Sequence, residues 1–137
     1  MEKDIESIKI DPVTGKKLRR GVRVITIDYS GLKEKIAMPG WYAGRGDEGY
    51  HSKTDLKIYD RALNKLKAKH DNLLLPEQIR ETRKLLKLTQ VEAGELIGGG
   101  IRAFQKYESG DGLPSKAVSN LLVILAKKPE LIKLIAK

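Results

Sequence analysis

The stretch "TQVEAGELIGGGIRAFQKYESG", from Thr89 to Gly110, contains two short helical patterns separated by three glycines. Its first four residues have the spacing of a capping box. In that motif the Thr89 hydroxyl accepts a hydrogen bond from the backbone N–H of Glu92, and the Glu92 side chain accepts one from the backbone of Thr89. A helix is therefore predicted to begin at Thr89. It should end at residues 98–100, because a glycine run destabilises a helix and permits the positive φ angles of a tight turn.

A second helix is predicted from about Ile101 to Ser109, ending at Gly110. Positions spaced i, i+3, i+4 and i+7 share one side of a helix, and here they form a polar stripe of Arg102, Gln105, Lys106 and Ser109. The opposite side is predicted to face the core with Ile101, Phe104 and Tyr107. A solvated surface helix would show the same stripe, but this one follows a capped short helix through a tight turn. The combination indicates a helix-turn-helix, whose second helix enters the major groove of DNA.

The polar stripe carries residue types that read DNA. Arg, Gln and Lys side chains hydrogen-bond to guanine and adenine edges in the major groove, so we predict DNA contacts from Arg102, Gln105, Lys106 and Ser109. Thr89 and Gln90, at the start of the first helix, are placed for the phosphates. In this arrangement the second helix would contact the bases, and the first helix would contact the phosphates of the DNA backbone.

Glu108 is an acidic residue beside the predicted DNA-binding face. It could point toward the DNA, where its charge would be unfavourable. It could instead turn inward and pair with Arg80 or Arg83 on the helix predicted to begin at Pro76, and this is the interpretation that we favour.

The rest of the second half is also helical. Pro76 suits a first helical position, since its missing N–H has no partner there, and Ser115 is a predicted N-cap for a helix reaching Lys127. Pro129 opens one more helix, which makes five from residue 73 onward.

The first half has a different character. Arg23–Tyr29 is rich in β-branched residues, Ser30-Gly31 is a turn signal, and Leu32–Met38 completes a predicted β-hairpin. "PGWYAGRGDEGYH" is predicted to be a loop, and a helix should run from about Asp55 to Lys69. The predicted core residues are Ile25, Ile27, Tyr29, Trp41 and Tyr42.

Together these patterns predict an α+β chain of two domains. Residues 1–72 form a small β-hairpin and helix domain, and residues 73–137 form an all-α five-helix helix-turn-helix domain. The formal net charge of +9 favours a polyanionic partner, either nucleic acid or an acidic protein surface, although a merely solubilising basic surface is the alternative. The charged start and the absence of a long apolar run predict a soluble, cytoplasmic protein without membrane contact.

The segment "LKLTQVEAGELIGGGIRAFQKYESGDGLPSKAVSNLL" resembles the Cro/repressor type of helix-turn-helix domain. The triple glycine before "AFQKYESG", together with "KKPELI", is similar to the MqsA/YgiT family of antitoxins, as are "DPVTGKKLRRGVRVITIDYSG", "MPGWYAG" and "DRALNKLKA" upstream. The resemblance implies a C-terminal domain that dimerises and represses its own operon at a palindromic operator. It also implies an N-terminal domain that neutralises a partner toxin, in related systems an RNA-cleaving protein.

One departure from this family concerns metal. Family members usually carry two Cys-x-x-Cys pairs that bind a structural zinc, whereas this chain has no cysteine, with Asp11 and Ala43 at expected cysteine positions. Oxygen and nitrogen ligands from Asp11, Asp47, Glu48 and His51 would be a poor substitute for thiolates. We therefore expect neither a metal nor any other cofactor.

Two other functions stay open from the sequence. A stand-alone helix-turn-helix regulator could use its N-terminal domain to sense a small molecule. A small enzyme is disfavoured, because neither His51 nor His70 has a nucleophile at a recognisable spacing, so no catalytic residue is predicted.

Overall fold

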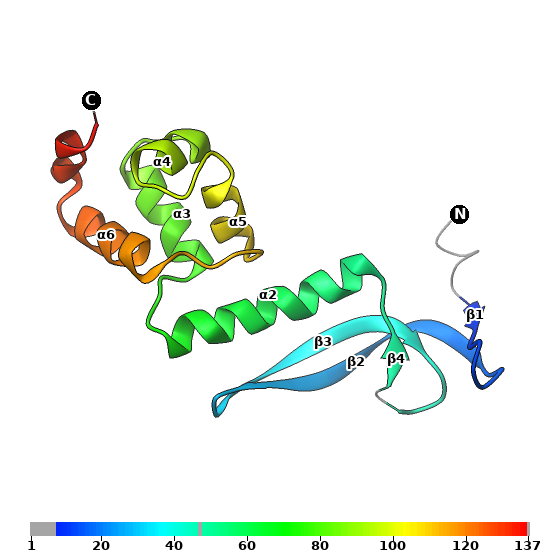
Figure 1. Cartoon of the computed structure of the whole chain (residues 1–137). Coiled ribbons are helices and arrows are strands. Elements are labelled where there is room, and N and C mark those ends of the chain that lie inside the picture. The colour runs from blue at the N-terminus through cyan, green and yellow to red at the C-terminus, as the bar shows by residue number, and fades with distance from the viewer. Residues whose placement is uncertain (1–7, 47, 137) are drawn as a thin grey trace. The chain divides into compact units, whose positions relative to one another are not determined.

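The structure is a computed structural model that describes residues 8–46 and 48–136. Its contacts divide the chain into two compact units, Met1–Ala62 and Leu63–Lys137 (Figure 1). The described residues of the first unit form an antiparallel sheet and the first part of helix α2 (Lys53–His70), and those of the second unit are helical. The predicted mixed α+β class is confirmed.

The sheet of the N-terminal unit has the order β1-β2-β3-β4, and every neighbouring pair is antiparallel. A long hairpin of β2 (Lys17–Tyr29) and β3 (Leu32–Tyr42) dominates it, and β1 (Ile8–Ile10) and β4 (Gly49–Tyr50) are short (Figure 1). The hairpin turns at Ser30 and Gly31, which both have positive φ. The predicted hairpin is therefore present, with longer strands than expected.

The loop prediction was wrong for residues 39–42, which continue strand β3, and for Gly49 and Tyr50, which form strand β4. Trp41 and Tyr42 pair with β2 on one side and with β4 on the other, and both are buried. The proline and glycine that suggested a loop occupy a stretch of β3 that β4 does not reach, and proline is tolerated on such an edge. Burial of two large aromatic side chains outweighs the local loop propensity.

The core of the N-terminal unit contains three of the five predicted residues, namely Ile27, Trp41 and Tyr42. Ile25 and Tyr29 are only half-buried, so the prediction that these two residues belong to the core was wrong.

Helix α2 begins with a reciprocal cap close to the predicted start. The backbone N–H of Asp55 donates to Ser52 Oγ at 3.1 Å, and Asp55 Oδ2 accepts from the Ser52 N–H at 3.0 Å. The same carboxylate is bidentate with the Arg20 guanidinium of β2, with Nη1 at 2.7 Å from Oδ2. Asp55 thus joins the start of α2 to the sheet within the N-terminal unit.

The C-terminal unit contains four α-helices after α2, namely α3 (Pro76–Leu85), α4 (Gln90–Leu96), α5 (Ala103–Ser109) and α6 (Lys116–Lys127). Pro76 at the first helical position and the N-caps Thr89 and Ser115 are all confirmed. The last predicted helix is the 3-10 helix η1 (Pro129–Leu134) rather than an α-helix.

The core of this unit forms around α5. Phe104 is fully buried and packs with Ile79 of α3, Ala93 of α4 and Leu122 of α6. The short helices α4 and α5 are therefore held by tertiary packing, since helices of seven residues are not stable alone.

Candidate functional site

The turn between α4 and α5 brings the two helices very close together. Residues 98, 99 and 100 have φ values of 126°, 99° and 98°, which only glycine adopts at low cost. Gly94 within α4 is equally constrained, because a Cβ there would lie 1.9 Å from the carbonyl oxygen of Gly100. The Gly100 N–H in turn donates to Gly94 O at 3.3 Å. The glycines thus permit a close approach that fixes α5 against α4.

Helix α5 starts two residues later than the sequence predicts. Arg102 is its N-cap, and Ile101 lies in the turn with 56% of its surface exposed. The prediction that Ile101 faces the core was wrong, because the glycine turn uses residues 101 and 102 before the helix begins. Phe104 is buried as predicted, and Tyr107 is half-buried against the core.

Three of the predicted DNA-contacting side chains share an exposed surface at the start of α5. Arg102, Gln105 and Lys106 are all exposed. Among the residues that the structure describes, none forms a side-chain hydrogen bond or ion pair with these three. The two cations and the amide are therefore available to a ligand.

Glu108, the one acidic residue of α5, is withdrawn from this surface. Its carboxylate is 1% exposed and accepts from Arg83 Nε at 2.8 Å and from Arg83 Nη2 at 2.9 Å, with Arg80 Nε at 3.5 Å. The inward orientation that the sequence favours is confirmed. Burial raises the pKa of Glu108, but hydrogen bonds from Arg83 and Gln90 and the charges of both arginines outweigh it, so the net shift is downward.

The other predicted contact residues are partly engaged within the protein. The Ser109 hydroxyl donates to Lys106 O at 3.1 Å and accepts from the Asp111 N–H at 3.3 Å, so it caps the end of α5. Thr89 Oγ1 accepts from the Glu92 N–H at 3.1 Å, which completes the predicted capping box, and its side chain is exposed.

Gln90 has a structural role that the sequence did not reveal. It is half-buried, and its side chain lies near Glu108 and helps to lower the pKa of that carboxyl. This contact links α4 to the buried ion pair between α5 and α3. Neither the Gln90–Glu108 contact nor the close approach at Gly94 has a local sequence signal, because both depend on how the helices pack.

The hairpin of the N-terminal unit exposes a second surface. Among the described residues, no strand pairs with the outer edge of β2 beyond Arg19 or with β3 before Trp41. Val22 and Val24 on one face of β2 are 55% and 66% exposed. An uncovered edge beside exposed apolar side chains is a surface that another protein chain can bind.

Comparison with known proteins identifies the family. A family model for the antitoxin component of bacterial toxin–antitoxin systems, MqsA, matches residues 9–136. Antitoxin MqsA of Escherichia coli (strain K12) is 32% identical over 114 residues, which cover 82% of this chain and 87% of that protein. The chain belongs to the MqsA antitoxin family. Membership implies a cognate toxin as a partner.

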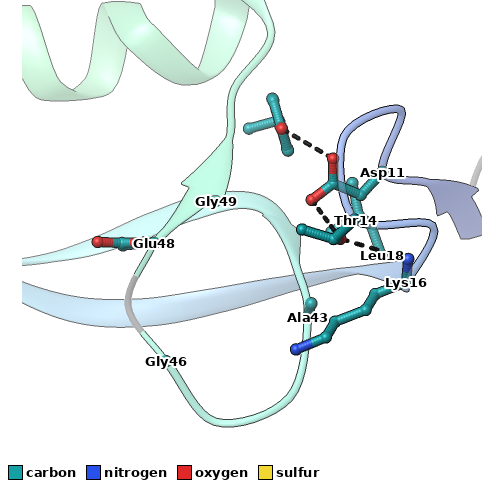
Figure 2. A pocket seen from close by; sticks show the side chains of 9 residues that line it. Asp11, Thr14, Lys16, Leu18, Ala43, Gly46, Glu48 and Gly49 are labelled. Carbon is teal, nitrogen blue, oxygen red and sulfur yellow. Dashed lines mark hydrogen bonds between the residues drawn. The ribbon is translucent and has the colours of Figure 1, made fainter.

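The residues present do not fit the zinc that the MqsA family resemblance implies. The Cys-x-x-Cys spacing falls on Asp11-x-x-Thr14 and Ala43-x-x-Gly46, and these four residues line one open cavity of about 620 Å³ (Figure 2). One carboxylate and one hydroxyl cannot replace four thiolates. Within the described part of the chain, no three His, Asp or Glu residues gather to hold a metal ion, and Asp47 lies outside that part.

Across residues 8–46 and 48–136, no helix combines the length and the apolar character needed to cross a bilayer.

Proposed function

We propose that this antitoxin is a DNA-binding autorepressor that acts in the cytoplasm and reads its operator with α5, as the second helix of a helix-turn-helix. The observation that carries the proposal is the charge arrangement of α5. Arg102, Gln105 and Lys106 are exposed and unpaired among the described residues, while Glu108 is buried against Arg83. The α5 surface is therefore free of negative charge from its own helix, which favours its approach to the negatively charged DNA.

The DNA-binding domain comprises residues 73–137 in this proposal and works as a homodimer. One such module buries too little surface for tight specific binding, so two copies should bind a palindrome with half-sites ~34–36 Å apart. Exposed apolar side chains on α6 and η1 support self-association, among them Ile124 at 52% and Leu134 at 76% exposure.

Arg102 and Lys106 are the strongest candidates for base contacts, with Gln105 between them. Ser109 and Gln90 act mainly by keeping α5 and α4 in place, since Ser109 is hydrogen-bonded to the α5 backbone and Gln90 interacts with the buried Glu108. Thr89 retains an exposed hydroxyl at the start of α4 for a phosphate.

Replacement of Arg102 by alanine tests base reading. Arg102→Ala should weaken operator binding by ~1–3 kcal/mol and relax the preference at one position of each half-site. The matched control is Lys127→Ala, which removes one exposed cation from α6 and should change operator binding only slightly. Titrations against operator and scrambled DNA at several salt concentrations separate the two effects. Operator affinity equal to that of the parent in Arg102→Ala would exclude α5 as the reading helix.

Residues 1–72 provide the toxin-binding domain in this proposal, and the toxin is an RNA-cleaving protein. The supporting observation is the uncovered hairpin edge beside Val22 and Val24. A partner strand could pair with this edge, and the basic segment at residues 16–23 would attract an acidic partner.

The hairpin surface can be tested with matched charge substitutions. Val24→Glu places an acid on the proposed surface and should reduce co-purification of the cognate toxin by roughly tenfold or more. Val13 is also highly exposed but lies in the β1–β2 turn, so Val13→Glu is the control and should leave toxin binding unchanged. Equal loss in both variants would place the toxin elsewhere.

A further inference from the structure

The cavity between the β1–β2 turn and the β3–β4 loop lies where two Cys-x-x-Cys pairs would meet. Asp11, Thr14, Ala43 and Gly46 all line it (Figure 2). A metal there would hold the turn and the loop to each other through four bonds. In this chain the two segments must be held by other means.

Asp11 makes the contacts that hold the β1–β2 turn in place. It is 9% exposed, and its Oδ1 accepts from the Val13 N–H at 2.8 Å and from the Tyr50 hydroxyl at 3.0 Å. Its Oδ2 accepts from Thr14 Oγ1 at 2.8 Å (Figure 2). Backbone bonds at 2.8 Å from the Gly15 N–H to Asp11 O and from the Asp11 N–H to Lys16 O close the turn. One carboxylate thus shapes the β1–β2 turn and ties it to Tyr50 of β4.

Arg23 of β2 makes the contacts that hold the β3–β4 loop in place. Its Nη2 donates to Gly44 O at 2.7 Å and its Nε donates to Gly46 O at 3.2 Å. The guanidinium also lies over the Tyr42 ring, 4.6 Å from its centroid. A planar guanidinium can hold two carbonyl oxygens at once, so the β3–β4 loop is fastened to the hairpin by one side chain.

We propose that Asp11 and Arg23 take over the structural task of a metal in this unit. Asp11 fastens the β1–β2 turn to β4, and Arg23 fastens the β3–β4 loop to β2. The N-terminal unit is therefore independent of zinc, and, without thiolates, it is also insensitive to thiol oxidation.

Hydrogen exchange on the full chain tests the Asp11 contact directly. Asp11→Ala should accelerate exchange of the Val13 amide by roughly tenfold or more, because its acceptor is lost. Tyr50→Phe removes only the hydroxyl bond to β4 and should mobilise the β1–β2 turn without unfolding the sheet. Asp28→Ala is the control, since Asp28 accepts from the Gly31 N–H at the hairpin tip and its loss should leave Val13 unchanged.

Arg23→Gln should give the corresponding loss of order in the β3–β4 loop, seen as faster exchange at Ala43 to Gly46. For the parent protein, a strong chelator and a thiol oxidant should leave the melting temperature unchanged. The proposal is overturned if Val13 exchange in Asp11→Ala matches the parent, or if the chelator lowers the melting temperature of the parent.

Introducing cysteines at positions 11, 14, 43 and 46 tests whether these four positions lie close enough together to bind one metal ion. A chain with Asp11→Cys, Thr14→Cys, Ala43→Cys and Gly46→Cys should bind one zinc ion and become sensitive to chelator. A Cβ at Gly46 meets no atom within 4 Å, so the substitution fits there. The two-cysteine chain with only the first pair changed is the control and should bind zinc far more weakly. A folded four-cysteine chain that takes up no zinc would show that the cavity positions do not converge, and it would refute the proposed replacement.

Discussion

The two units of this antitoxin are stabilised in different ways. The C-terminal unit has a contiguous apolar core around Phe104, and its helices are terminated by caps and glycines. In the N-terminal unit, charged side chains fasten the segments around the sheet: Asp11 holds the β1–β2 turn, Arg23 holds the β3–β4 loop, and the Arg20–Asp55 pair holds the start of α2. The N-terminal unit should therefore respond to loss of Asp11, Arg23 or Asp55 and to acid, whereas the C-terminal unit should respond most to loss of apolar volume.

The largest effect is expected from truncating the centre of the helical core. Phe104→Ala removes a fully buried ring that contacts three other helices, and it should lower the free energy of unfolding of the C-terminal unit by ~3–5 kcal/mol. Denaturant melts followed by hydrogen exchange at α3 and α6 amides measure this. Leu134→Ala, at a side chain 76% exposed, is the control and should cost little. A small effect of Phe104→Ala would contradict the assignment of the core.

The buried ion pair should give the next largest effect. Arg83→Met leaves the buried Glu108 carboxylate with only the longer contact to Arg80, at 3.5 Å, and should cost ~3 kcal/mol. The double variant Arg83→Met with Glu108→Gln should recover part of that loss, because no charge is then stranded. A double-mutant cycle of unfolding free energies measures the coupling. Additive losses would show that Glu108 does not depend on Arg83.

Local rules predicted the elements whose ends are set by neighbouring residues. The Thr89 and Ser115 caps, the proline at position 76 and the glycine turn each act within a few residues, so they could be read directly. The inward turn of Glu108 followed from helical spacing and the need to neutralise a buried charge.

The errors in the sequence interpretation share a physical cause. Residues 39–42 became strand because their aromatic side chains are buried by distant elements, and Ile101 became exposed because the glycine turn delays α5 by two residues. Likewise, nothing in the local pattern around Gln90 indicates its contact with Glu108, which depends on packing of α4 against α5. Tertiary contacts of this kind cannot be derived from local propensity.

The acid sensitivity of the N-terminal unit should exceed that of a variant without Asp55. The hydrogen bond from Arg20 holds the pKa of Asp55 at about 2, below its ordinary value. A depressed carboxyl pKa stabilises the folded state above the unfolded pKa, roughly 3.9, and this contribution is lost as the pH falls through about 2. Because Arg20 is 37% exposed, we expect only ~1–2 kcal/mol.

The measurement compares the parent with Asp55→Asn between pH 7 and pH 2, using exchange of β2 and β3 amides. The parent should be more stable at pH 7, and the difference should shrink below about pH 4. Asp11 also has a lowered pKa, mainly through the Val13 N–H, but it is present in both proteins and cancels in the comparison. A difference that stays constant with pH would show that the Arg20–Asp55 pair does not stabilise the fold through charge.

The smallest effect separates capping from DNA contact at the start of α4. Thr89 and Ser115 are both N-caps whose hydroxyl accepts a backbone N–H at 3.1 Å, so alanine at either position should cost a similar ~1 kcal/mol of unfolding free energy. Only Thr89 is proposed to contact a phosphate. Thr89→Ala should therefore weaken binding to operator and scrambled DNA alike, whereas Ser115→Ala should leave both affinities near the parent values once the folded fraction is matched. If the two variants lose DNA affinity equally, Thr89 acts only as a helix cap, and the phosphate contact must be assigned to another residue of the C-terminal unit.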